Sequence, residues 1–223
     1  MEYYKELDIN EVTFTKTKAL IKRAHQIAFA MGLWVQKLST APEWALPYLK
    51  QLRSDTIQLI PSIILGNRRG LHLYERACIE DFLRYFYFFD HKIECILLQN
   101  NPTKYQNLDF LIKWIRNYPT FSDYKESVFT HCSNLTFRYK ELSRTIHGSP
   151  IDEFELSDSL TTLHKPIENS RKEGARMKSI FESIFFLLSL FHLSEYNSFL
   201  LDELVNICQN LGKRDKRILS GTE

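Results

Sequence analysis

The sequence contains few glycines and prolines, seven of each among 223 residues. Because these residues form most tight turns, their scarcity favours long helices over many short strands. Apolar residues make up 44% of the chain and charged residues 25%, which is ordinary for a globular protein with a sizeable core. The sequence therefore predicts an all-α fold, an up-and-down bundle of long helices that forms one domain over residues 1–223.

Cysteines are also few, and none of the four has the Cys-x-x-Cys spacing of a zinc site. The sequence also lacks a His-Glu-x-x-His pattern, paired carboxylates at metal-ligand spacing and the glycine-rich motifs that bind nucleotide phosphates. We therefore predict neither a metal ion nor a cofactor. Cys78 and Cys95 lie in apolar segments and resemble small buried hydrophobic residues, which favours a reducing, cytoplasmic location.

No long hydrophobic run is present. The longest, residues 184–193, is far short of the ~20 residues that span a bilayer, so we expect no membrane association. The net charge of +2 is too small to indicate a nucleic-acid or membrane partner by itself. Basic residues do cluster at 213–217. We interpret residues 213–223 as a disordered basic tail, with a phosphate-binding tail as the alternative.

Apolar residues instead recur at spacings of three and four over most of the chain, as in amphipathic helices. Residues 148–175 interrupt this pattern and are polar, so we expect a linker there with a short helix at 152–163. Gly212 is expected to end the last helix. The predicted long helices and one short one cover residues 11–37, 44–65, 71–98, 108–116, 124–147 and 170–211.

Two polar groups could carry chemistry, and the first lies in the third predicted helix. Arg76, Glu80, Arg84 and His91 follow one another at steps of four, four and seven, which places them on one helix face. The aromatic residues between them would partly desolvate this face and strengthen its charge interactions. The alternative is a structural network in which Glu80 pairs with both arginines and His91 bonds to a backbone carbonyl.

The second group lies before Gly148. Tyr139, Ser143 and His147 are spaced by four residues, and Arg144 lies three residues before His147. In the structural alternative, Ser143 bonds back to its own helix, His147 caps the helix and Arg144 is solvated. A serine hydrolase is improbable, because the sequence has no glycine-flanked nucleophile elbow.

These two segments together resemble the HEPN-type helical proteins of prokaryotes, many of which belong to toxin–antitoxin and anti-phage systems. The resemblance covers roughly residues 70–150 and depends on two stretches, Glu-Arg-Ala-Cys-Ile-Glu-Asp-Phe-Leu-Arg at 75–84 and Tyr-Lys-Glu-Leu-Ser-Arg-Thr-Ile-His-Gly at 139–148. It implies a helical bundle, often dimeric, and in active members a metal-independent ribonuclease. Their motif is an arginine, four to six residues and a histidine, and two copies meet across a dimer.

The resemblance also implies roles for the residues. A histidine, His147 or His91, would move the proton of the RNA 2′-hydroxyl, while Arg84 and Arg144 would stabilise the phosphate. Three further side chains, those of Arg76, Tyr139 and Ser143, would bind substrate or orient His147, and Glu80 would orient an arginine.

Three functional interpretations remain open from the sequence. The first is an RNA-cleaving HEPN-like protein. The second is a catalytically inactive subunit that binds and regulates a protein partner from the same defence or toxin system, with a homodimer as a further possibility. The third is a plain helical scaffold in which all the polar pairs are structural.

Overall fold

A computed structural model of the protein describes residues 11–101, 106–146, 167 and 169–221. Every regular element in these ranges is a helix, which confirms the predicted all-α fold. The elements in chain order are α2 (Glu11–Lys37), α3 (Leu46–Ile64), α4 (Arg68–Asp90), α5 (Lys92–Asn100), α6 (Leu108–Arg116), the 3₁₀-helix η1 (Pro119–Tyr124), α7 (Lys125–Ile146), α8 (Ser170–Phe191), α9 (Leu193–Asn197), α10 (Leu201–Cys208) and α11 (Lys213–Ser220).

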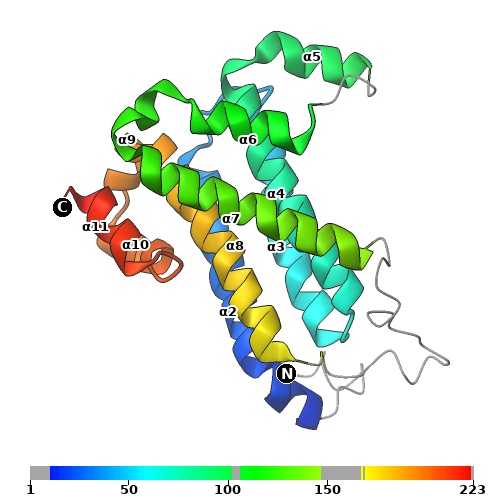
Figure 1. The fold of residues 1–223 in the computed structure, drawn as a ribbon. Coiled ribbons are helices and arrows are strands. Elements are labelled where there is room, and N and C mark those ends of the chain that lie inside the picture. Colours follow the sequence, from blue (N-terminus) through cyan, green and yellow to red (C-terminus); the bar gives the residue numbers. More distant parts are fainter. Residues whose placement is uncertain (1–10, 102–105, 147–166, 168, 222–223) are drawn as a thin grey trace.

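The long helices form a closed ring around the core (Figure 1). Helix α3 packs between α2 and α4, α7 packs against both α4 and α8, and α8 packs against α2. The connections from α2 to α3 and from α3 to α4 are short, as expected for neighbouring antiparallel helices. Helix α7 crosses the outside of α8 and α4, and one of its faces is open to solvent.

Aromatic side chains fill the end of the bundle where α4, α6, η1 and α8 meet. Phe86 of α4 is fully buried, and its ring centroid lies 3.9 Å from that of Phe191. The rings of Trp114, Tyr118 and Phe121 surround it at 5.6–5.7 Å. Part of the unusual aromatic content therefore serves the core, where each ring buries a large apolar area.

The predicted helix over residues 71–98 is wrong in one respect, because it is broken at His91. The His91 ring donates from Nδ1 to the carbonyl oxygen of Tyr87, at 2.7 Å. In a continuous helix that carbonyl would accept the backbone N–H of His91, which bonds instead to Phe88 at 3.3 Å. The side chain thus competes with the backbone, ends α4 and lets α5 project from the bundle (Figure 1).

The C-terminal part also differs from the prediction. Residues 170–211 form three helices, and Gly212 precedes α11 rather than ending a helix. Residues 213–220 are helical, so the expected disordered tail is wrong there. The reason is an apolar pair, Ile218 and Leu219, which is buried against the bundle among the basic residues. Residues 170–175 belong to α8, and the rest of the expected linker, except 167 and 169, lies outside the described residues.

No helix in the described part of the chain is both long and apolar enough to cross a membrane. Three of the four cysteines, Cys78, Cys95 and Cys132, are buried and unpaired by disulfides. Burial raises the pKa of the Cys132 thiol to about 12, which leaves it protonated and unreactive at neutral pH.

Candidate functional site

Helices α4 and α7 bring four of the predicted site residues together. Arg76, Glu80, Arg84 and Tyr139 line one cleft of about 470 Å³, which the start of α6 closes on one side. The α4 residues share a face because they follow one another at four-residue steps. Since α7 packs against α4, Tyr139 reaches that face from a segment about 60 residues away in the sequence.

Glu80 is the centre of the polar network in the cleft. Its Oε1 accepts hydrogen bonds from the Tyr139 hydroxyl at 2.7 Å and from Arg76 Nε at 3.0 Å, and Arg84 Nη2 lies 3.5 Å from Oε2. Arg76 also donates from Nη2 to the Tyr139 oxygen at 2.8 Å, and its guanidinium lies 4.8 Å from the centre of the tyrosine ring. A carboxylate, a phenol and two guanidinium groups are thus held in fixed relative positions.

This network is partly open to solvent. The side chains of Arg76, Glu80 and Arg84 are 23%, 26% and 32% exposed, so an incoming ligand can reach them without unfolding the helix. Burial and the neighbouring Glu80 carboxylate raise the pKa of Tyr139, which keeps the phenol protonated at neutral pH. The cleft therefore contains an acceptor and a donor of protons, 2.7 Å apart, beside two permanent positive charges.

His91 does not join this site. It lines a different surface pocket, with Trp114 and Tyr118, and its ring stacks on Tyr87 with centroids 4.0 Å apart. Its bond to the Tyr87 carbonyl is the contact that the structural alternative predicted. His91 lies seven positions after Arg84, which corresponds to a rise of about 10 Å along the helix. The two halves of this predicted arginine–histidine pair therefore face separate cavities.

The residues of the second predicted group do not come together in one site either. Ser143 donates to the carbonyl oxygen of Tyr139 at 2.8 Å, as its structural alternative predicted. Arg144 is exposed at the end of α7 and does not line the cleft. His147 lies outside the described residues, so its predicted role as proton carrier stays a prediction.

Two further charged residues line the cleft, Lys140 and Asp109, and neither was among the predicted site residues. Lys140 follows Tyr139 directly and adds a third cation. Asp109 follows Asn107, whose side chain caps α6 through a 2.9 Å bond from the backbone N–H of Phe110. The Asn-x-Asp pattern in the sequence predicts the start of a helix at this point. Only the packing of α6 beside α4 and α7 shows that the start of α6 borders the cleft.

A pair of carboxylates, Asp55 of α3 and Asp81 of α4, lies where these two helices pack together. Burial and the charge of Asp55 raise the pKa of Asp81 to about 7, and burial also raises the pKa of Asp55. Because two nearby carboxylates cannot both ionise without repulsion, the pair retains a proton over part of the neutral range.

We expect Asp81→Asn to remove part of a pH dependence in the free energy of unfolding. The folded pKa of Asp81, about 7, exceeds its unfolded value of about 3.9, so its stabilising contribution is complete below pH 4 and is lost as the pH rises through 7. For a shift of this size the loss is about 2 to 4 kcal/mol. Urea unfolding between pH 4 and 9 measures it. The exposed Asp123→Asn should keep the wild-type profile, and an unchanged profile in Asp81→Asn would contradict the assignment.

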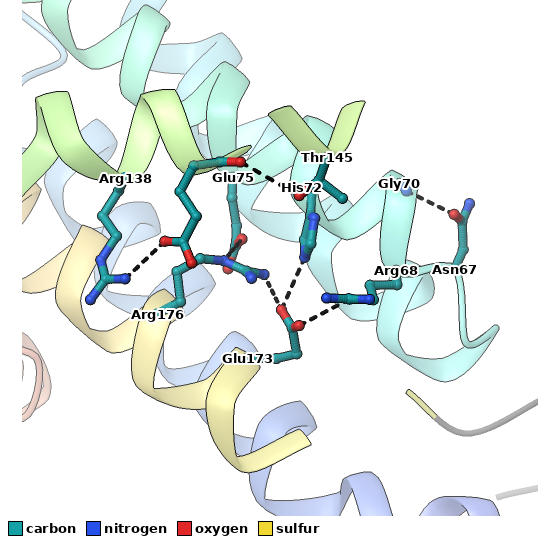
Figure 2. Close-up of polar contacts among 10 residues, drawn as sticks. Asn67, Arg68, Gly70, His72, Glu75, Arg138, Thr145, Glu173 and Arg176 are labelled. Carbon is teal, nitrogen blue, oxygen red and sulfur yellow. Dashed lines mark hydrogen bonds and ion pairs between the residues drawn. The ribbon is translucent and has the colours of Figure 1, made fainter. Parts of the chain in front are cut away.

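A second ionic cluster, absent from the predicted site residues, lies between α4 and α8 (Figure 2), and its members other than Arg68 are buried. Arg176 is 3% exposed and pairs with two carboxylates, Glu75 at 2.8 Å and Glu173. Glu173 also accepts from His72 Nε2 at 3.0 Å and from Arg68 Nε at 3.1 Å. Glu173 and Arg176 are three residues apart on α8, but their partners on α4 lie about 100 residues away in the sequence, so no local pattern reveals the whole cluster.

The two carboxylates of this cluster have opposite pKa shifts. Burial raises the pKa of Glu75 to about 7 in spite of Arg176, and the Oε1 atom of Glu75 is buried without a hydrogen-bond partner. Burial acts on Glu173 in the same direction, but the His72 hydrogen bond and the charge of Arg176 together lower its pKa to about 2. Burial lowers the pKa of His72, which is therefore neutral at pH 7. The cluster therefore has a structural role, because it joins α4 to α8, and it is not an open binding site.

The described residues contain no group of three or more His, Cys, Asp or Glu side chains that could hold a metal ion. No protein-family model, curated protein or solved structure matches the chain, so the HEPN-like relationship stays a prediction from its residues.

Proposed function

We propose that the protein is a cytoplasmic, metal-independent endoribonuclease of a prokaryotic anti-phage or toxin–antitoxin system. The observation that supports this proposal most is the Glu80–Tyr139 hydrogen bond beside Arg76 and Arg84, in a cleft that solvent can enter. The same cleft joins the two HEPN-like stretches, residues 75–84 and 139–148, because each contributes side chains to it.

The proposed proton transfers of RNA cleavage use the Glu80–Tyr139 pair. Glu80 takes the proton of the ribose 2′-hydroxyl, and the 2′-oxygen attacks the adjacent phosphorus. The P–O5′ bond breaks as Tyr139 gives its proton to the leaving 5′-oxygen. The proton on Glu80 then returns to Tyr139 along their 2.7 Å hydrogen bond. One product ends in a 2′,3′-cyclic phosphate and the other in a 5′-hydroxyl.

The arginines supply the charge stabilisation. Negative charge increases on the phosphate oxygens as the 2′-oxygen attacks, and guanidinium groups fixed in advance stabilise it. Arg76 is positioned by Glu80 and Tyr139, while Arg84 is held more loosely at 3.5 Å. Lys140 at the rim adds attraction for the neighbouring phosphate.

The test is cleavage of a labelled RNA by the purified protein in the presence of EDTA. We expect fragments that end in a 2′,3′-cyclic phosphate, whereas the same sequence as DNA should stay intact because it lacks the attacking hydroxyl. Resistance of all RNAs tested, with and without extracts of phage-infected cells as a source of activators, would reject the proposal.

A second candidate function is an interaction subunit that regulates a protein partner, and helix α5 favours it. Ile93, Ile96 and Leu97 are 71%, 42% and 45% exposed on this projecting helix. Exposed apolar side chains at spacings of three and four form a face that a partner could cover. A stoichiometric protein that co-purifies with the wild type but not with Ile93→Asp/Leu97→Asp, with no RNA cleavage in either state, would favour this function.

A further inference from the structure

The outer face of α7 combines exposed aromatic rings with positive charge. Phe129 and Phe137 are 57% and 61% exposed, although large apolar rings are normally buried. They are eight residues apart, so they lie on the same side of the helix, about 12 Å apart along its axis. Figure 1 shows that this helix lies on the outside of the bundle, across α4 and α8.

Each of these rings has a cation over one of its faces. The guanidinium of Arg116, from α6, lies 4.4 Å from the centre of the Phe129 ring, and Arg116 also bonds to Ser133 at 2.9 Å. The guanidinium of Arg138 lies 5.2 Å from the centre of the Phe137 ring. A cation on one side fixes the ring and leaves its other side for a further flat group.

The charge on this face is positive overall. Lys140 and Arg144 are exposed there, and no described carboxylate forms an ion pair with either. The two acidic residues of this part of α7 are already paired, Glu141 with Arg138 at 2.8 Å and Glu126 with Arg214 at 3.5 Å. The face is therefore suited to an anionic ligand that also carries flat apolar groups.

We propose that this face of α7 binds single-stranded RNA, with bases stacked on Phe129 and Phe137 and phosphates near Lys140 and Arg144. Single strands fit this surface because their bases are free to stack on aromatic side chains, whereas a duplex hides them. The face continues directly into the catalytic cleft, since Lys140 belongs to both. This inference rests on the proposed function for the identity of the ligand as RNA.

The experiment measures binding separately from cleavage. A fluorescent 12-nucleotide RNA with 2′-O-methyl groups cannot be cleaved, and its anisotropy reports the dissociation constant. We expect Phe129→Ala/Phe137→Ala to weaken binding at least tenfold, because stacking on an aromatic side chain changes affinity by about 5- to 160-fold per base. Lys140→Ala should lower the slope of log affinity against log salt by about 0.7.

A matched control is Phe29→Ala. Phe29 is 56% exposed on α2, outside the residues that line the cleft, so its loss should leave binding unchanged. Thermal unfolding checks that all variants fold. Unchanged affinity in the folded double variant, or equal affinity of the wild type for a duplex of the same sequence, would overturn the inference.

Failure of the proposed function can be told apart from failure of this inference. Binding that needs Phe129 and Phe137, without cleavage of unmodified RNA, would support the binding surface and reject the nuclease. Cleavage at the wild-type rate by Phe129→Ala/Phe137→Ala would support the nuclease and reject the binding surface.

Discussion

Replacing Arg176 with methionine should lower the free energy of unfolding by about 3 to 5 kcal/mol at pH 7. Arg176 is 3% exposed and is the cation shared by Glu75 and Glu173. Methionine fills a similar volume but leaves a buried negative charge with fewer partners, and such a charge is costly in an apolar interior. Equilibrium unfolding in urea measures the loss.

Arg171→Met is the matched control, because Arg171 is exposed on the same helix, and its effect should stay within about 0.5 kcal/mol. If Arg176→Met does not fold, the triple variant Glu75→Gln/Glu173→Gln/Arg176→Met provides the comparison, since it removes the unpaired charges together with the cation. We expect the triple variant to be more stable than Arg176→Met alone. Equal stability of Arg176→Met and Arg171→Met would disprove the stabilising role of the Arg176 cluster.

Glu80→Gln should reduce RNA cleavage by at least about 100-fold while the protein stays folded. The amide keeps the shape of the carboxylate and can still accept a hydrogen bond from Tyr139, but it cannot take a proton from the 2′-hydroxyl. Initial rates on a fluorogenic RNA measure the effect, and anisotropy with the uncleavable RNA should show retained binding.

The control for this variant is Glu141→Gln. Glu141 is 28% exposed and forms an ion pair with Arg138, so it matches Glu80, at 26%, in exposure and pairing, but it does not line the cleft. Its loss should change the cleavage rate less than about threefold. Cleavage by Glu80→Gln at the rate of Glu141→Gln would remove Glu80 from the mechanism.

The sequence predicted those helices whose limits are set by neighbouring residues. The bounds of α2 and α6 agree with the prediction, because apolar spacing continues through Glu11–Lys37 and an asparagine flanks each end of Leu108–Arg116. A bond from His91 to a backbone carbonyl was one predicted alternative, but the break in the helix follows only because the accepting carbonyl is that of Tyr87 in the same helix. Helix α11 was not predicted, because its basic residues suggested a solvated tail. The burial of Ile218 and Leu219 against the bundle stabilises the helix instead.

The candidate site was predictable only in part, for a similar reason. Four-residue steps placed Arg76, Glu80 and Arg84 on one face, and helix periodicity alone is sufficient for that. Periodicity cannot show that Tyr139 lies beside Glu80, or that His91 turns away from Arg84. Those two facts depend on how α7 crosses α4 and on where α4 ends.

The position of Arg176 in the chain has a consequence for synthesis on the ribosome. Glu75 and the cleft residues emerge first, whereas Arg176 and the rest of α8 follow about 100 residues after Glu75. Until then Glu75 has no cation beside it, and the ring of helices lacks the member that joins α7 to α2. The nascent chain through α7 therefore cannot complete its core, and the cleft takes its final shape only after α8 has been made.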